Sequence, residues 1–331
     1  MGLKVALNGF GRIGRHVFRA HYGGDAFEIV AINDLFPPEL MAYLLKYDSV
    51  YRTWDQEVKH DDDNIIVNGK PIPFSNTKKI DDLNWGGQDI DLVIEATGVF
   101  MHPDKARLHL GRCKKVVLTA PAKAEGKDVV TIVMRCNENM YDAGKHNIIS
   151  NASCTTNCFA PMVKVLDDNF KIEKGLMTTI HAYTATQGLL DVPIKTKDRS
   201  RAAAINIIAS TTGAAVAIKH IFPKLEGKLD AMSFRVPVPT VSVVDFVCNV
   251  EKAASKDDVN KAFKTAADGE LKDIMQYVDD ALVSGDFIQD AHSCSFDPEW
   301  TRVSKDGKLI KTVGWYDNEW GYSSRMVDLV K

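Results

Sequence analysis

The amino-acid sequence predicts an α/β protein in two parts: a doubly wound parallel sheet, followed by an α+β domain with a mostly antiparallel sheet. Short apolar strands alternate with helices as far as Ser150, which is typical of a parallel sheet covered on both faces. Beyond Ser150 the strands become longer and the strict alternation stops. The 331 residues also exceed what one hydrophobic core usually holds, so we expect a domain of residues 1–151 and a second of residues 152–318.

The first part begins with a strand–helix–strand unit. Lys4–Asn8 is a short apolar strand, Arg12–Tyr22 is a helix with apolar residues on one face, and Glu28–Asn33 is a second apolar strand. The helix is long enough to form a crossover, so the two strands are expected to be parallel. Further strands are predicted at Asp91–Glu95, Lys115–Thr119, Asp128–Met134 and Asn147–Ser150, with a helix at Pro103–Gly111.

The segment from residue 58 to residue 74 has the pattern of an antiparallel hairpin. Strand residues at Val58–His60, Asn64–Val67 and Lys70–Phe74 are interrupted by Asn68-Gly69, a dipeptide typical of tight turns. Asp61–Asp63 is interpreted as a solvated turn, because three adjacent carboxylates on an extended chain cannot converge on one metal ion. We predict no metal site.

The second part is predicted to mix strands and helices without alternation. The strands are expected at Gly175–Tyr183, Ala231–Val236 and Val241–Val250. The helices are expected at Thr155–Asp168, Ile205–Ile221 and Lys256–Ala267.

Composition favours an ordinary globular enzyme. The net charge is −3 and 45% of the residues are hydrophobic, so a nucleic-acid or membrane partner has no support from the charge balance. No secretory signal or apolar stretch of about 18 to 20 residues is present, and we expect a cytoplasmic protein. Six scattered cysteines form neither a disulfide framework nor a metal pair, and most are expected to be buried.

A G-x-G-x-x-G motif directly follows the first strand and opens the first helix. Its residues are Gly9, Gly11, Arg12, Ile13 and Gly14, together with Phe10. Backbone N–H groups and the helix dipole at such a turn would receive a pyrophosphate, which predicts a Rossmann-type dinucleotide-binding domain.

Asp34 ends the second strand, twenty residues after Gly14. A carboxylate at this place can bind both hydroxyls of an adenosine ribose and would repel a 2′-phosphate, so NAD is favoured over NADP. A glycine turn followed by an unrelated aspartate is the structural alternative.

Cys154 is the candidate nucleophile. It follows an apolar strand and begins a helix, where the helix dipole would stabilise a thiolate and lower its pKa. His181 ends the strand Met177–Ile180 and could serve as the general base for Cys154. The sequence does not prove that Cys154 and His181 meet. Cys158, one helical turn after Cys154, is interpreted as a packing neighbour.

Two groups of polar residues are suited to phosphate anions. Arg199 lies in a polar loop, and the Ser210–Gly213 segment supplies hydroxyls beside a flexible backbone. Arg235 lies in an otherwise apolar strand, where its charge would be costly unless it meets an anion. A structural salt bridge is the alternative for Arg235.

These residues resemble the phosphorylating, NAD-dependent glyceraldehyde-3-phosphate dehydrogenase family over essentially the whole chain. The most specific block is Ser150–Asn157, supported by the tetrapeptides that begin at His181 and Phe234 and by Trp315–Tyr322. The resemblance implies oxidation and phosphorylation of D-glyceraldehyde 3-phosphate to 1,3-bisphosphoglycerate through a thiohemiacetal and a thioester on Cys154. His181 is then the base, and inorganic phosphate is the second substrate.

The resemblance also assigns binding roles residue by residue. Asn318 would bind the nicotinamide carboxamide, and residues 319–331 would return as a helix to the NAD-binding domain. Further cofactor contacts are expected at Thr97, Gly98, Thr119 and Tyr322. The two phosphates are expected at Ser153, Thr155, Thr184, Arg199, Thr212, Gly213 and Arg235.

In this family the loop from about Tyr183 to Ala203 lines the cofactor site of a neighbouring subunit, which implies a homotetramer. Val192-Pro193 stands where NAD-specific members usually have Leu-Pro, a mild change that leaves the NAD prediction in place. Val238 and Thr240 also depart from the common Thr and Asn, and Asn76-Thr77 replaces an Arg near the adenine.

Two other functions stay open from the sequence. An erythrose-4-phosphate dehydrogenase shares the cysteine block but usually departs from the His-Ala-Tyr-Thr pattern, so Thr184 favours the triose substrate. An inactive NAD-binding regulator or RNA-associated protein is disfavoured by the intact Cys154, His181 and Arg235 and by the absence of a basic excess.

Overall fold

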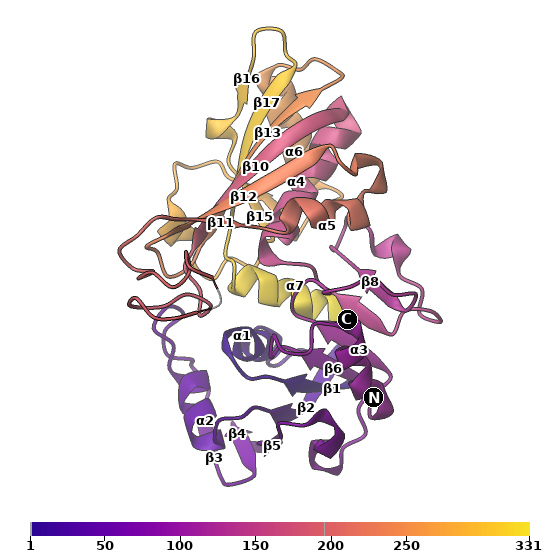
Figure 1. Cartoon of the computed structure of the whole chain (residues 1–331), viewed down its shortest axis with the longest axis vertical. Helices are drawn as coiled ribbons and strands as arrows, with labels where there is room; N and C mark the ends of the chain where they lie inside the picture. The colour runs from indigo at the N-terminus through magenta and orange to yellow at the C-terminus, as the bar shows by residue number, and fades with distance from the viewer. Residues whose placement is uncertain (1, 195) are drawn as a thin grey trace. The chain divides into compact units, whose positions relative to one another are not determined.

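The computed structural model describes residues 2–194 and 196–331 (Figure 1). The chain divides into two compact units. The first contains the chain up to Ile132 together with Asn139–Ala152 and Ser323–Lys331, and the second contains Val133–Glu138 and Ser153–Tyr322. None of the helices in the described part of the chain is long and apolar enough to span a membrane.

The first unit is a doubly wound sheet, as predicted. Strand β1 (Leu3–Asn8) pairs in parallel with β2 (Phe27–Asn33) on one side and with β6 (Leu92–Glu95) on the other. Helix α1 (Arg12–His21) makes the crossover from β1 to β2. The sheet order is β3-β4-β5-β2-β1-β6-β7-β9-β8, so the chain changes direction at β1 and β6. Ligands bind doubly wound sheets at such a switch point.

The remaining strands of this sheet include the predicted hairpin. Strand β4 (Asn64–Val67) pairs antiparallel with β3 (Val58–His60) on one side and with β5 (Lys70–Ser75) on the other, and β5 joins the main sheet in parallel beside β2. The left-handed backbone of Asn68 (φ 49°) and Gly69 (φ 78°) confirms the tight turn. The other edge is formed by β7 (Lys115–Leu118), β9 (Ile148–Ser150) and β8 (Val129–Thr131), all parallel.

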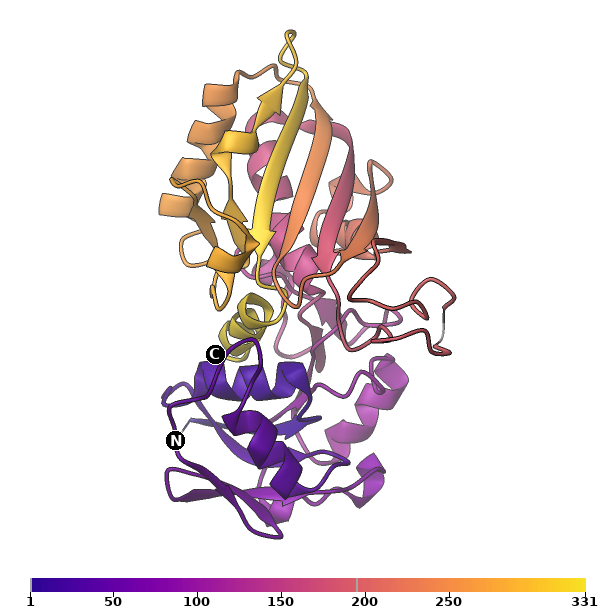
Figure 2. The ribbon, with the colours of Figure 1, turned by 90° about the vertical axis from the view of Figure 1, so that its left-hand side faces the viewer.

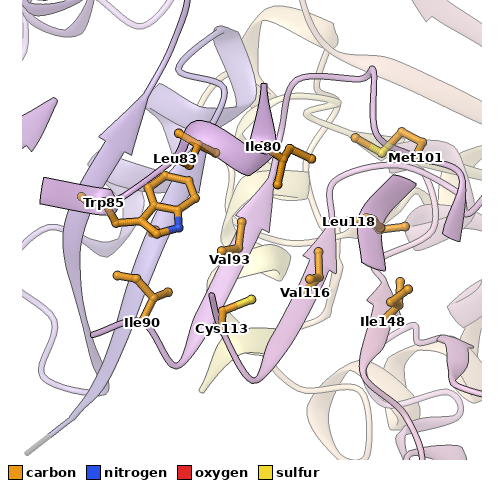
Figure 3. Close-up of a cluster of buried hydrophobic side chains, with 13 residues drawn as sticks. Ile80, Leu83, Trp85, Ile90, Val93, Met101, Cys113, Val116, Leu118 and Ile148 are labelled. Carbon is orange, nitrogen blue, oxygen red and sulfur yellow. The ribbon is translucent and has the colours of Figure 1, made fainter. Parts of the chain in front are cut away.

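A buried apolar cluster packs on one face of this sheet (Figure 3). Val93 and Val116 contribute side chains from adjacent strands, and Trp85 and Met101 cover them from the connecting segments. Trp85 is part of a short 3₁₀ helix, η2 (Trp85–Gly87). Burial of these large side chains holds the ends of β1 and β6 in fixed positions.

Helix α2 (Pro38–Lys46) was not predicted, because the two adjacent prolines at its start resemble a loop. Pro38 is tolerated there since the first helical residue needs no N–H. The predicted helix Pro103–Gly111 is α3 (Pro103–Ala106) followed by a tighter 3₁₀ turn, η3 (Arg107–Gly111). The predicted strand Asp128–Met134 is shorter, since only the three residues of β8 pair with β9.

The second unit contains a mixed, mostly antiparallel sheet of order β11-β12-β10-β13-β17-β15-β14, with β16 beside β17 (Figure 2). Only the pairs β10–β12 and β14–β15 are parallel among the described strands. The strands are β10 (Ile172–Ala182), β11 (Ile208–Thr211), β12 (Leu229–Val236), β13 (Ser242–Val250), β14 (Met275–Tyr277), β15 (Cys294–Phe296), β16 (Arg302–Val303) and β17 (Leu309–Tyr316).

Helices α4 (Cys154–Phe170), α5 (Ala214–Ile221) and α6 (Lys256–Asp268) pack on the strands of this unit. Phe246 of β13 is fully buried and meets Phe159 of α4 edge to face, with ring centroids 4.8 Å apart. Burial alternates strictly along β13, so its other residues form a second, half-exposed face.

The predicted helix Ile205–Ile221 is wrong in its first half. Ile208–Thr211 forms β11 and pairs antiparallel with β12, and α5 begins only at Ala214. The β-branched residues before Gly213 favour a strand, and Gly213 then caps the helix. The predicted C-terminal helix is confirmed as α7 (Trp320–Val330).

Candidate functional site

The turn between β1 and α1 is built on glycines that no larger residue could replace. Gly9 has a left-handed backbone (φ 96°), and a Cβ there would lie 2.7 Å from the Ala96 carbonyl carbon after β6. A Cβ on Gly14 would lie 2.2 Å from the Gly9 oxygen. These two glycines therefore serve the close packing of the turn itself.

Gly11 is different, because a Cβ there would meet no atom within 4 Å. It stands at the N-cap of α1 and lines a cavity of about 320 Å³. The open space at a helix N-terminus leaves room for a pyrophosphate to approach the backbone N–H groups. The first unit therefore fits a dinucleotide at the place that the motif predicted.

Asp34 lines the same cavity. Its Oδ2 accepts a hydrogen bond from the Phe10 N–H at 2.7 Å, and its Oδ1 accepts one from the Phe36 N–H at 3.2 Å. The carboxylate is thereby held against the glycine turn. The sequence analysis missed the apolar and basic wall of this cavity, which includes Leu35, Phe36, Lys78, Val99 and Phe100.

The other predicted cofactor residues are distributed unevenly. Arg12 is paired with Asp48, with Nη1 and Oδ2 2.8 Å apart. Thr97 lines the cavity, whereas Thr119 donates its hydroxyl to the Glu95 carbonyl oxygen at 3.0 Å. Gly98 has a left-handed backbone (φ 75°) in the turn after β6, and Ile13 is half-buried in the first turn of α1. Asn318 and Tyr322 belong to the second unit.

Glu95 is a buried residue at this site that the sequence analysis did not select. Its carboxylate accepts hydrogen bonds from the Thr97 N–H at 2.9 Å and from Asn8 Nδ2 at 2.6 Å, and it lies 3.0 Å from His109 Nε2. The Thr97 hydroxyl also donates to it. A carboxylate in an apolar strand was the available signal, since such a group needs several partners when it is buried.

In the second unit, Cys154 is the first residue of α4. Ser153 caps this helix, because its Oγ accepts the Thr156 N–H at 3.1 Å. Cys154 Sγ lies 3.5 Å from His181 Nε2, so the structure brings the proposed nucleophile and base together. The sequence alone did not establish this contact.

His181 is held by the adjacent parallel strand. It lies beside Arg235 in the register of β10 and β12, and Arg235 Nη1 is 2.9 Å from His181 Nδ1. His181 Nδ1 is also 2.7 Å from the Ala182 carbonyl oxygen. Arg235 Nη1 donates to the same Ala182 oxygen at 3.0 Å, so the guanidinium and Nδ1 can share one acceptor without being bonded to each other. With the ring proton of Nδ1 donated to that oxygen, the lone pair of Nε2 faces the sulfur of Cys154, as a general base requires.

The resting pair is neutral. Burial raises the pKa of the Cys154 thiol, against the opposing effects of the Arg235 charge and of hydrogen bonds from Thr155. Burial and the neighbouring Arg235 lower the pKa of His181 to about 3. The predicted lowering of the thiol pKa is therefore wrong in this geometry, because the helix N-terminus does not offset desolvation of the sulfur.

Tyr316 packs against the Cys154–His181 pair. Its hydroxyl lies 2.8 Å from Thr155 Oγ1 and 2.9 Å from Thr179 Oγ1, and its ring meets His181 edge to face. Burial raises the pKa of Tyr316, so it stays a neutral phenol. Thr155, predicted to contact phosphate, is thus already engaged with Tyr316 through its hydroxyl.

Arg235 has no carboxylate partner in the part of the chain that the structure describes. Its Nη1 donates to the Ala182 oxygen at 3.0 Å, and its Nε is buried without any hydrogen-bond partner. Burial, followed by the charge of Arg199, lowers the pKa of Arg235. The structural salt bridge considered as an alternative is therefore absent among these residues, and an anion would satisfy the site.

Arg199 lies in a cavity of about 900 Å³ together with Thr186 and Ser210. Its guanidinium donates to the Thr186 hydroxyl at 3.0 Å and to the Ser210 hydroxyl at 3.2 Å. Thr184 extends this network, with its hydroxyl 2.9 Å from that of Thr186. The side-chain hydrogen bonds of Arg199 go to hydroxyls, so its guanidinium can still meet a phosphate, beside the Asp198 carboxylate that lines the same cavity.

Thr212 and Gly213 stand at the start of α5. The Thr212 hydroxyl accepts the Ala214 N–H at 3.3 Å, and a Cβ on Gly213 would meet nothing within 4 Å. They do not line the cavity of Arg199, but they present a helix N-terminus with open space.

A Rossmann-type nucleotide-binding unit and a cysteine–histidine pair in contact are together typical of an NAD-dependent oxidoreductase with a thiol nucleophile. The family comparisons are more specific. Residues 3–103 match the NAD-binding domain model of glyceraldehyde 3-phosphate dehydrogenase, and residues 153–318 match its C-terminal domain model. The chain belongs to the glyceraldehyde-3-phosphate dehydrogenase family, as the resemblance predicted.

Curated relatives agree over nearly the full length. The chain is 52% identical to glyceraldehyde-3-phosphate dehydrogenase 2 of Streptomyces avermitilis, covering 99% of this chain and 98% of the relative. It is 52% identical to the enzyme of that name from Streptomyces coelicolor, with the same coverage. It is 48% identical to glyceraldehyde-3-phosphate dehydrogenase 1 of Bacillus subtilis, covering 99% and 97%.

The carboxylate of Asp34 is predicted to select NAD. Asp34→Asn keeps an oxygen that can accept the Phe10 N–H but removes the negative charge, so the turn should persist. Repulsion of a 2′-phosphate disappears, and Lys78 in the same cavity can then attract it. We expect the NADP/NAD ratio of kcat/KM to rise at least about tenfold. An unchanged ratio would show that another group discriminates.

The charge of Arg235 is predicted to lower the pKa of both Cys154 and His181. Arg235→Leu removes a positive charge that favours the thiolate and disfavours the imidazolium, so both pKa values should rise. The pH midpoint for alkylation of Cys154 by neutral iodoacetamide should move up by roughly one unit. Arg302→Leu, on the exposed β16, is the matched control and should leave the midpoint in place. A downward shift in Arg235→Leu would contradict the electrostatic role.

Proposed function

We propose that this protein oxidises and phosphorylates D-glyceraldehyde 3-phosphate to 1,3-bisphosphoglycerate with NAD, and that Cys154 carries the covalent intermediates. The observation that carries the mechanism is the 3.5 Å contact between Cys154 Sγ and His181 Nε2. The family membership and the relatives' names support the reaction.

The first step is attack of the sulfur on the aldehyde carbon. Because both groups of the resting pair are neutral, the thiol proton passes to His181 Nε2 as the carbon–sulfur bond forms, and His181 then gives this proton to the former carbonyl oxygen. The product is a thiohemiacetal, whose oxygen would be held by the Cys154 N–H at the helix N-terminus and by His181.

Oxidation and release follow on the same sulfur. NAD supplies the acceptor for the hydride that leaves the thiohemiacetal carbon. His181 takes the hydroxyl proton in that step, which leaves a thioester on Cys154. An oxygen of inorganic phosphate then attacks the thioester carbon, and the carbon–sulfur bond breaks with its electron pair left on the sulfur. The phosphate proton passes to Cys154 Sγ, the acyl phosphate is released, and His181 gives its proton to solvent.

The two arginines couple substrate binding to the strength of the base. Arg235 and Arg199 both lower the pKa of His181 in the resting site. A bound phosphate would neutralise part of this positive charge and raise the imidazole pKa toward its usual value. The substrate phosphate is assigned to Thr184 and Arg235, and the attacking phosphate to Ser153, Thr155, Arg199, Thr212 and Gly213.

Residues 1–151 with the helix 319–331 are proposed as the NAD-binding domain and residues 152–318 as the catalytic domain. The glycine turn, the open space at Gly11 and the strand-end Asp34 support NAD in the first. The erythrose 4-phosphate alternative is not favoured by the relatives, and comparison of the rates on the two sugars would decide it.

A cytoplasmic homotetramer is proposed as the working form. The uncovered face of the second sheet supports this assembly, because it exposes Leu176 of β10 and Met232 of β12. Further exposed apolar side chains in this unit are Leu189, Leu190, Ile205, Ile207 and Val216. Exposed apolar side chains that gather into one patch usually mark a partner surface. The loop 183–203, whose Lys195 lies outside the described residues, is proposed to reach a neighbouring cofactor site.

The reaction is tested by NADH formation from glyceraldehyde 3-phosphate. We expect sustained turnover only when inorganic phosphate is present, since hydrolysis of the thioester is slow without that nucleophile. Cys154→Ser should abolish turnover while NAD still binds, because the hydroxyl is a much weaker nucleophile beside the same base. Cys113→Ser, a buried thiol of the first unit, is the control that should stay active. Phosphate-independent turnover or an active Cys154→Ser enzyme would refute the proposal.

The assembly is tested by light scattering coupled to gel filtration. The wild-type protein should have the mass of four chains, and Leu176→Glu should shift it to smaller species, because the charge would have to be buried at the interface. Leu108→Glu, an exposed position of the first unit, should leave the mass unchanged. A wild-type monomer would contradict the homotetramer.

A further inference from the structure

The hydroxyl of Ser242 lies where three strands of the second unit end. Ser242 is the first residue of β13, it is opposite Tyr316 at the end of β17, and its neighbour β10 ends at Ala182. The side chain is 2% exposed. His181 therefore lies one residue before the end of β10, and Asn318 lies two residues after the end of β17, the two strands that flank β13 at Ser242.

One oxygen atom joins these strand ends. Ser242 Oγ accepts the Ala182 N–H at 3.1 Å and donates its own proton to Asn318 Oδ1 at 2.9 Å. A serine hydroxyl can accept and donate at once, and both of these bonds are buried. The residue after the proposed base is thus connected to Asn318 through a single side chain.

This bond defines which way the Asn318 amide faces. With Oδ1 turned toward Ser242 the hydroxyl proton has an acceptor, and the two amide hydrogens are directed away from Ser242. A flipped amide could donate Nδ2–H to the second lone pair of Oγ, but the buried hydroxyl proton would then lose this acceptor, so the Oδ1 orientation is favoured. The backbone of Asn318 is held as well, because Asp317 Oδ1 accepts the N–H groups of Glu319 and Trp320 at 3.0 and 2.9 Å. The side chain of Asn318 is then held by its own hydrogen bond to Ser242.

We propose that Ser242 is a positioning residue for binding of the nicotinamide half of NAD. It holds the Asn318 amide so that Nδ2 donates to the carboxamide oxygen of the nicotinamide. This rests on the proposed NAD-dependent function. Without the Ser242 hydroxyl, the Asn318 amide can flip by roughly 180° around its last side-chain bond. It then presents Oδ1, an acceptor, to the carboxamide oxygen of the nicotinamide. The affinity for the nicotinamide half of NAD then falls, while the adenosine half is unaffected.

The test compares NAD with ADP-ribose, which lacks the nicotinamide. Isothermal titration without aldehyde gives the dissociation constant of each ligand for the wild-type protein and for Ser242→Ala. We expect NAD to bind about 2- to 10-fold more weakly to the variant, the effect of one neutral hydrogen bond, with ADP-ribose unchanged. Ser242→Thr keeps the hydroxyl and should restore the wild-type ratio of the two constants.

Ser233→Ala is the matched control. Ser233 is also 2% exposed and lies on the neighbouring β12, but its hydroxyl has no hydrogen-bond partner in the described part of the chain. Its removal should leave both dissociation constants in place. A similar loss of NAD affinity in this variant would show that any buried serine of the sheet has the effect, and would overturn the proposal.

A double-mutant cycle separates positioning from a general structural role. If Ser242 acts through Asn318, Ser242→Ala should change the NAD/ADP-ribose ratio in the wild type but not in an Asn318→Ala background. Ser242→Cys, close in volume, replaces the alanine variant if that one does not fold. An unchanged ratio, an equal loss for both ligands, or unfolding of both variants would overturn the role of Ser242. A wild-type protein that does not bind NAD would instead refute the proposed function.

Discussion

The buried guanidinium of Arg235 is the charge that acts on both groups of the Cys154–His181 pair, in addition to the effect of burial. It contacts His181 and the Ala182 oxygen, and no carboxylate among the described residues neutralises it. This one charge favours the Cys154 thiolate, disfavours the His181 imidazolium and leaves a buried Nε that needs an acceptor. A buried cation is stable only with hydrogen bonds or an anion, and an anion at Arg235 would satisfy its free Nε. If the substrate phosphate binds there as proposed, substrate binding and activation of the base become the same electrostatic event.

The first unit depends on the absence of side chains rather than on a charge. Gly9 and Gly14 permit close backbone contacts in which a Cβ would clash, whereas no protein atom fills the space where a Cβ of Gly11 would lie. The same motif therefore contains two kinds of glycine. Packing requires the first kind, and the second has a reason only if a ligand approaches the backbone there.

Much of the fold and of the candidate site could be predicted from the sequence, because it depends on short local motifs. The glycine turn, the strand-end Asp34 and the cap before Cys154 are all signals within a few neighbouring residues. The strand β11 was missed because the isoleucines from Ile205 to Ile208 fit a helix or a strand equally well, and pairing with β12 decides between the two. The prediction of the Cys154 pKa was wrong, and Glu95 and Ser242 were missed, for a common reason: burial and long-range partners are properties of the folded state. Ser242, for example, bonds residues that lie 60 and 76 positions away along the chain.

Sheet register is the constraint that brings the distant residues together. His181 and Arg235 are direct neighbours in the parallel pair of β10 and β12, and Ser242 and Tyr316 are neighbours in the antiparallel pair of β13 and β17. A slip of one residue in either pair would turn a side chain to the opposite face of the sheet. The buried apolar face, with Phe246 against Phe159, makes such a slip costly. The hydrophobic core thus maintains the ångström-scale placement of polar groups that it does not itself contact.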